Sequence, residues 1–220
     1  MMPADIVTYA RAKYNATGDT FFSDQELYYY IYQALCDLAV QTEFLEKVDS
    51  STVTVAGTRT YDFLSDCSAI KRLELIDSGG ISLKLEKITF REDDALTLEN
   101  VASTTSGKPQ FYEVWNQVIY LRPIPDSVYT LKQYYYGIPQ VPTATSTIEL
   151  DSLFHMDLVD YCVREMYAKD QNATMFTAYD AKWNRALAKI KMWIQKRKRT
   201  DAFTIVMNED NLAVTLTGPV

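Results

Sequence analysis

The sequence predicts an α+β fold, in which a body of four helices, two N-terminal and two C-terminal, holds an inserted antiparallel β domain and ends in an extended C-terminal arm. Apolar residues recur every three or four positions up to residue 48 and again over 147–200, which is the helical period. Between these regions and after residue 200 the spacing changes to the alternation typical of strands. We therefore expect an N-terminal helical part over 1–48, a β-rich insertion over 49–140, a C-terminal helical part over 147–200 and an extended arm over 201–220.

Composition excludes several classes of protein. With 47% hydrophobic residues in 220, the chain can bury a sizeable core. Its net charge of −7 argues against a protein that coats nucleic acid. The 3 cysteines are widely spaced, which indicates neither a disulfide framework nor a CxxC metal or redox motif and favours synthesis in a reducing cytoplasm. We expect a soluble chain, because no secretory leader and no long apolar run occurs.

The N-terminal part predicts two helices. A short amphipathic helix covers residues 4–14 and ends at Asn15 and Gly18. Ser23 and Glu26 then form a capping box that begins a second helix. Apolar residues at multiples of three and four carry this helix through about six turns, with its core positions at Leu27, Ile31, Leu35, Leu38 and Leu45.

The β-rich insertion begins with alternating strands over 52–55 and 61–64 and a hairpin of 70–76 with 81–85, turned by Gly79 and Gly80. Thr89 is placed to cap a short helix over 90–98. The acidic run 92–94 could be considered an acid–base or cation cluster. A solvated first turn is the favoured interpretation, because the run lacks the glycine and spaced ligands of a calcium loop.

Residues 107–139 predict three strands: 111–115 and 117–122, joined around Asn116, and 129–136 after a proline-rich turn over 123–127. The third strand places Tyr134 and Tyr136 on one face and Leu131 and Tyr135 on the other. Apolar or aromatic groups on both faces indicate a sheet covered twice, once by its own domain and once by a helix or a neighbouring molecule.

The first C-terminal helix begins near Asp151 or Ser152, and its apolar positions are Met156, Val159, Val163 and Met166. His155, the 1 histidine of the chain, lies in its first turn. A lone histidine cannot assemble a metal site without carboxylate or thiolate partners, so a structural role is the favoured interpretation.

The last helix, about 173–199, separates apolar from basic residues. Its apolar stripe comprises Tyr179, Trp183, Leu187, Ile190 and Ile194, and a separate stripe comprises Lys182, Arg185, Lys189 and Lys196. No acidic residue occurs over 181–200, and the helix ends in a basic run, 196–199. Three explanations are open: complementation of the helix dipole, an acidic groove on another protein, or the phosphate backbone of DNA.

One pattern resembles a known family. The order P-x-x-Y, N-x-V-I-Y-L and P-x-P-D-x-x-Y-T-L with a run of tyrosines, followed by a linker and two helices, is similar to the head-to-tail adaptor proteins of tailed bacteriophages. The matching residues are Pro109, Tyr112, Asn116, Ile119, Leu121, Pro123, Pro125, Asp126, Tyr129, Leu131, Tyr134 and Tyr135.

The resemblance implies a virion structural protein without enzymatic activity, cofactor or metal. Such proteins form a connector or neck ring, usually of twelve subunits, that joins the capsid portal to the tail and continues the DNA channel. The expected partners are other copies of the chain, the portal protein and the tail or next neck-ring protein. Genomic double-stranded DNA would pass through without specific binding, and no membrane is involved. The expected location is the neck of the virion, after synthesis in the host cytoplasm.

We predict a protein interface on the basic last helix and the arm beyond it, and we rank protein contact above DNA contact because DNA must slide through a channel. The arm is expected to add strands to a neighbour, the alternative being a hairpin folded back on its own body. Tyr134 and Tyr136 are expected between subunits. The predicted interface residues are Lys182, Arg185, Lys189, Lys196, Arg197, Lys198, Arg199, Phe203, Ile205, Met207, Leu212, Val214 and Leu216.

Two other functions stay open. A nucleic-acid-binding module would use the basic helix over 182–199 and would show steep salt dependence. A carboxylate-dependent hydrolase would need two converging acids with separated pKa values, and no motif brings such a pair together. The sequence predicts no catalytic, cofactor-binding or metal-ligating residue.

Overall fold

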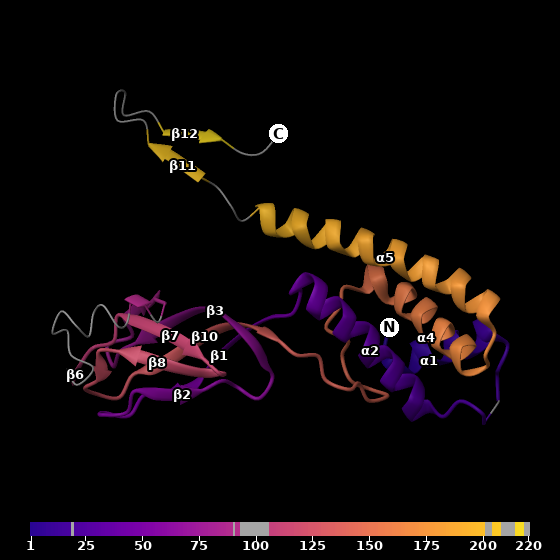
Figure 1. Cartoon of the computed structure of the whole chain (residues 1–220), viewed down its shortest axis with the longest axis horizontal. Helices are drawn as coiled ribbons and strands as arrows, with labels where there is room; N and C mark the ends of the chain where they lie inside the picture. The colour runs from indigo at the N-terminus through magenta and orange to yellow at the C-terminus, as the bar shows by residue number, and fades with distance from the viewer. Residues whose placement is uncertain (19, 90, 93–105, 201–203, 208–213, 218–220) are drawn as a thin grey trace. The chain divides into compact units, whose positions relative to one another are not determined.

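The computed structural model describes residues 1–18, 20–89, 91–92 and 106–197, and the backbone of 198–200, 204–207 and 214–217. The chain divides into two compact units (Figure 1). The helical unit comprises Met1–Phe44 and Gln140–Val220, and the β unit comprises Leu45–Pro139. Within the described residues the helical unit holds four α-helices and the β unit holds antiparallel and mixed sheets, so the predicted α+β class is confirmed.

The two N-terminal helices are α1 (Pro3–Tyr14) and α2 (Asp24–Thr42). Asn15 ends α1 in the left-handed conformation, with φ 67°. The Ser23 hydroxyl accepts a hydrogen bond from the Glu26 amide at 3.2 Å and caps α2, which is one half of the predicted capping box. The Glu26 carboxylate accepts from Tyr30 and Lys169 instead. The expectation of a longer second helix through Leu45 was wrong. Glu43, at φ 50°, ends α2, and Leu45 is buried in the β unit instead.

The two C-terminal helices are α4 (His155–Lys169), preceded by the 3₁₀ turn η1 (Ser152–Phe154), and α5 (Ala173–Thr200). Asp151 caps η1 by accepting from the Leu153 amide at 3.0 Å, and Asn172 caps α5 by accepting from the Met175 amide at 3.1 Å. α4 packs against α1, α2 and α5, so it is the central helix (Figure 1). Met156, in the first turn of α4, is exposed rather than buried as predicted.

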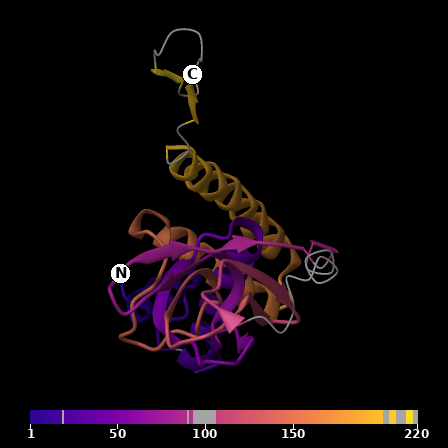
Figure 2. The same ribbon diagram turned by 90° about the vertical axis from the view of Figure 1, so that its left-hand side faces the viewer.

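The buried residues of the helical unit form one core from all four helices. Each predicted apolar position of α5 is in it, and Trp183 packs edge-on against Tyr161 of α4 with 4.8 Å between ring centroids. α5 is a single continuous helix, as Figures 1 and 2 show. Edge-on aromatic pairs at this distance add to the stability from area burial.

Among the described residues the β unit holds two four-stranded sheets. The first is antiparallel throughout, in the order β1 (Glu46–Val53), β10 (Thr130–Gly137), β3 (Cys67–Ile76), β4 (Ser82–Lys84). The predicted β3–β4 hairpin is confirmed. Gly80 supplies the positive φ of its turn, at 78°, and the Asp77 carboxylate accepts from the amides of Gly79 and Ile81.

The second sheet follows the order β2 (Thr60–Asp62), β8 (Val118–Arg122), β7 (Phe111–Trp115), β5 (Glu86–Lys87). The predicted turn around Asn116 is confirmed: Asn116 and Gln117 both have positive φ, at 48° and 63°, as a type I′ hairpin turn requires. β5 pairs parallel with β7. A further parallel pair joins β6 (Ser106–Gly107) to β9 (Ile124–Pro125), inside the predicted proline-rich turn.

The two sheets share one core, built from alternate positions of their strands. Figure 2 shows these strands from a second direction. The core residues are Leu73, Leu75, Leu85, Tyr112, Ile119, Leu121 and Leu131. β10 has the predicted alternation, with Leu131, Gln133 and Tyr135 buried and Tyr134 and Tyr136 on the other, half-buried face.

Two predicted elements lie partly outside the described residues. Of the helix expected over 90–98, Arg91 and Glu92 are helical, and the Glu92 carboxylate accepts from the Thr89 amide at 2.7 Å. Asp93 and Asp94 lie outside the described residues. In the arm, β11 (Thr204–Met207) pairs antiparallel with β12 (Val214–Thr217), so the two strands form a hairpin. Phe203 and Leu212 lie outside the described residues.

Replacing Trp183 by alanine should destabilise the helical unit by about 3–5 kcal/mol, because it leaves a cavity beside Tyr161. Urea unfolding followed by helical circular dichroism measures this. Trp115→Ala is the matched control: Trp115 is 60% exposed, so its loss should change stability by about 0.5 kcal/mol or less. Equal losses in the two variants would contradict the core position of Trp183.

Candidate assembly surfaces

The basic face of α5 is defined by Lys182, Arg185, Lys189 and Lys196, all of which are exposed. Within the described part of the chain, the first three make no ion pair with a carboxylate. Arg197 is also exposed, and Lys198 and Arg199 lie in the helix, their side chains outside the described set. α5 therefore presents a positive surface over its second half.

Several of these cations lie against aromatic rings. Lys182 Nζ is 4.0 Å from the centre of the Tyr179 ring, and Lys189 Nζ is 5.4 Å from that of Phe154. The Arg197 guanidinium is 5.0 Å from the Trp193 ring. The aliphatic stems thus cover apolar surface while the charged ends stay in water. These contacts with aromatic rings fix the positions of the basic groups and leave their positive charges unneutralised.

Arg164 fixes α5 on α4. Its guanidinium donates to Glu165 Oε1 at 2.5 Å and to Asp180 Oδ1 at 3.0 Å. It also lies 4.1 Å from the centre of the Tyr161 ring. A planar guanidinium that joins two carboxylates and an aromatic face sets direction as well as distance. Arg164 was not predicted as a site residue, because Asp180, its partner on α5, becomes a neighbour only when the two helices pack.

Asp157, on α4, faces the basic face of α5. Burial raises the pKa of its carboxyl, the positive charge of Lys189 opposes that shift, and the negative charge of Asp160 adds to it. Asp157 Oδ2 is buried and makes no hydrogen bond to any described residue. The ionised form of the Asp157 carboxyl is therefore destabilised in the folded protein.

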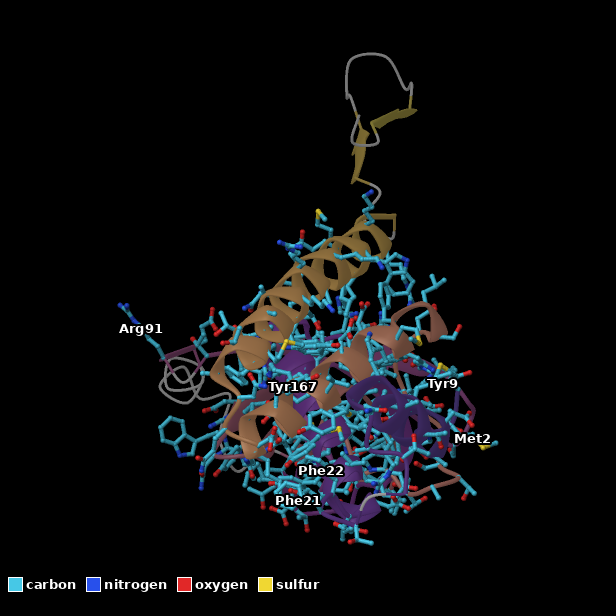
Figure 3. All side chains as sticks on the ribbon, turned by 90° about the vertical axis from the view of Figure 1, so that its right-hand side faces the viewer. Met2, Tyr9, Phe21, Phe22, Arg91 and Tyr167 are labelled. Carbon is cyan, nitrogen blue, oxygen red and sulfur yellow. The ribbon has the colours of Figure 1, made fainter. Side chains whose placement is uncertain are left out.

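A second cluster of cations and aromatic rings holds the connection between α1 and α2. Lys169 Nζ donates to the Phe21 carbonyl at 2.7 Å and to Glu26 Oε2 at 2.8 Å. Phe22 is buried, and its ring packs edge-on against that of Tyr14, with 5.2 Å between the centroids. The Tyr14 ring also contacts that of Tyr167. Figure 3 labels Phe21, Phe22 and Tyr167. Phe21 stays 54% exposed beside them. The sequence analysis missed this cluster, since Lys169 and Phe21 are far apart in the chain.

Tyr134 and Tyr136 lie on the outer face of the first sheet. Arg72 and Lys132 each approach the Tyr134 ring to 5.0 Å, and Lys71 approaches the Tyr136 ring to 5.9 Å. The predicted covering of this face thus comes in part from basic side chains of the sheet itself. A role between subunits stays a prediction.

His155 is buried in the helical unit, and its Nε2 lies 2.9 Å from the Leu150 carbonyl oxygen. No group of three or more His, Cys, Asp or Glu in the described residues could hold a metal ion. None of the helices described is long and apolar enough to cross a bilayer.

The structure thus combines a basic helix face and a terminal hairpin with a helical body and a β insertion. The family model of the SU10 adaptor protein matches residues 3–207. The chain belongs to the SU10 adaptor protein family. A search of curated proteins finds no match. Membership gives this adaptor a structural role at the phage head–tail junction, in association with other virion components such as portal and tail.

In this SU10 adaptor, Asp157→Asn should raise stability at neutral pH. The folded pKa of Asp157 lies above the unfolded value, so ionisation favours the unfolded state once pH rises through the unfolded pKa of about 3.9. The gain should shrink as pH falls toward that value. Urea unfolding at neutral and acidic pH measures it. Asp160→Asn is the control, because it removes the partner of Lys13 and should lower stability at neutral pH. A gain that is independent of pH would contradict the burial of an ionised carboxylate.

Proposed function

We propose that this adaptor forms a ring, a connector of about twelve subunits by its resemblance to head-to-tail adaptors, that joins the capsid portal to the tail and continues the DNA channel. The observation that carries the proposal is the family match over 3–207. The exposed basic face of α5 and the terminal hairpin support it, because they offer docking surfaces.

The carboxylates support an assembly role over a hydrolase. A general acid and base need pKa values that diverge within one pocket. Here Glu165 and Asp180 are both bound to Arg164. Burial raises the pKa of Glu26, but hydrogen bonds from Lys169 and Tyr30 outweigh it, and the pKa ends below its usual value. All three carboxylates are therefore engaged in structural ion pairs.

The basic face of α5 is proposed to meet an acidic surface of a portal, tail or adaptor subunit. Duplex DNA must slide through a channel, and each phosphate that a cation neutralises adds salt-dependent affinity. The aromatic contacts of Lys182 and Lys189 spread the positive charges along one helix face. Such a row fits a complementary acidic helix or strand, and the DNA passes without specific binding.

The terminal hairpin is proposed to grip the portal. β11 and β12 pair over four positions, and an isolated two-stranded hairpin is marginally stable in water. Strand addition to a sheet of the portal or of a neighbouring copy would complete it. Tyr134 and Tyr136 are proposed to help seal neighbouring subunits.

Deleting 201–220 should abolish attachment to the portal and leave the helical unit folded, because the described core residues of that unit all lie at or before Ile194. Attachment is read by native mass measurement of the chain with and without its portal. Deleting 218–220 is the matched control: it keeps both strands, so attachment should persist. If the 201–220 deletion variant attached to the portal at wild-type strength, the hypothesis that the arm grips the portal would be wrong.

Replacing Lys182, Arg185 and Lys189 together by glutamate should weaken docking about tenfold or more, because three favourable charge contacts become repulsive. The binding of portal, tail or adaptor partners is measured at two salt concentrations. Lys191→Glu is the control, since the helical period places Lys191 on the opposite flank of the apolar stripe.

DNA binding by the same variants separates the two uses of the basic face. The wild-type chain is expected to bind duplex DNA weakly and without sequence preference. Tight DNA binding with a steep salt dependence, lost in the triple variant while partner docking persists, would favour the nucleic-acid-binding module instead.

A further inference from the structure

The β unit contains a hollow at the point where the chain passes from one sheet to the other. β4 ends at Lys84 in the first sheet, and β5 begins at Glu86 in the second. The Leu85 amide donates to the Leu73 carbonyl at 3.0 Å, and the Glu86 amide donates to the Gln110 carbonyl at 2.9 Å. Backbone hydrogen bonds to both sheets therefore fix the walls of this hollow, whose volume is about 480 Å³.

The hollow carries a surplus of positive charge. Lys71, Arg72, Lys84 and Lys87 line it, against Glu86 alone among the acids. Lys71 pairs with Glu46 at 2.9 Å, and Arg72 pairs with Glu74. No carboxylate of the described residues lies within 4.0 Å of the Lys84 or Lys87 amine. Two cations thus stand at the hollow with their charge unmatched by the described residues.

The floor of the hollow combines apolar surface with a hydroxyl. Leu85 is 1% exposed and Tyr112 is 2% exposed, and both line the hollow. The Tyr112 hydroxyl makes no hydrogen bond to any described residue. Burial raises the pKa of Tyr112, so the hydroxyl keeps its proton and can donate. An anion in the hollow would accept this hydrogen bond.

These features select a carboxylate-bearing peptide. Its acidic groups would meet Lys84, Lys87 and the Tyr112 hydroxyl, and an apolar side chain would pack against the aliphatic stems of the lysines. Duplex DNA and free phosphate would bring anionic oxygens without such a side chain.

The chain itself offers a matching segment in residues 147–153. Glu149 and Asp151 are exposed, while Ile148 and Leu150 between them are buried, and Leu153 is 68% exposed. The segment therefore presents two carboxylates and one large apolar side chain together.

The surroundings of this segment are acidic as well. Residues 1–44 and 140–180 hold 13 acidic and 4 basic side chains. Those basic residues, Arg11, Lys13, Arg164 and Lys169, are all paired with carboxylates of the same unit. The charge of this surface is thus complementary to that of the hollow.

We propose that the hollow bounded by Lys84, Lys87 and Tyr112 binds segment 147–153 of a second copy of the chain. Glu149 and Asp151 pair with the two lysines, Tyr112 donates to a carboxylate, and Leu153 packs against the aliphatic stems of the lysines. This contact deepens the proposed ring, on which it rests, by naming the surfaces that join one subunit to the next.

A charge exchange in the full-length chain tests the contact. One variant carries Lys84→Glu with Lys87→Glu, and the other carries Glu149→Lys with Asp151→Asn, in which asparagine keeps the cap of η1. Neither variant should assemble alone, since like charges meet in both. An equimolar mixture should assemble with the two variants alternating, because every contact is then attractive. Native mass measurement reads the outcome, and circular dichroism confirms that each variant is folded.

A direct measurement keeps the hollow and the ring distinguishable. A synthetic peptide of residues 147–153 should bind the wild-type chain, with affinity lower by about tenfold in Lys84→Gln with Lys87→Gln and lower also in Tyr112→Phe, which keeps the packing. The same peptide with Glu149→Gln and Asp151→Asn is the matched control and should bind weakly.

If each charge variant by itself assembled as strongly as the wild type, the proposed contact would be wrong, while the proposal of a ring would stand. Binding of the peptide to a chain that stays monomeric, even with the portal, would support the hollow and overturn the ring. Absence of peptide binding would overturn the hollow, and so would displacement of the peptide by duplex DNA or inorganic phosphate at comparable concentrations.

Discussion

The pairing of β1 with β10 is the interaction on which the rest of the structure depends. These strands begin and end the insertion, and they lie side by side from Glu46 opposite Tyr136 onward. The Gly137 amide donates to the Leu45 carbonyl at 2.7 Å, and a side chain at Gly137 would meet Lys47 at 2.9 Å. The two ends of the β unit therefore close on each other. The helical segments before and after it can then share one core, at an entropic cost that grows only slowly with the length of the insertion.

Local patterns predicted most of the fold. The apolar stripe of α5, the Ser23 cap and the Asn116 turn depend on neighbouring residues, and the structure confirms them. The end of α2 was mispredicted because Glu43 adopts a left-handed conformation that usually marks glycine or asparagine. The parallel pairs β5–β7 and β6–β9 were not foreseen, since each includes a strand of only two residues, which is too short to show an alternation.

The candidate surfaces divide in the same way. The basic face of α5 follows from helical spacing within one segment, so the sequence analysis located it. Arg164, Lys169 and the hollow at Lys84 take their meaning from partners brought together by packing. Lys84 has no distinguishing neighbour in sequence, yet it lies beside Lys71, Arg72 and Tyr112 in the structure. Such sites need tertiary contacts that no periodicity encodes.

The separation of charge in the helical unit also limits the symmetry of any assembly. Residues 181–200 of α5 include 8 basic and no acidic residues, and residues 1–44 and 140–180 of the same unit are acidic. A twofold axis through either surface would bring like charges face to face. A rotation that sets the basic surface of one molecule against the acidic surface of the next keeps unlike charges together and leaves an open end at each step. Where such a rotation closes on itself, it gives a ring with a direction, in which every subunit faces the same way.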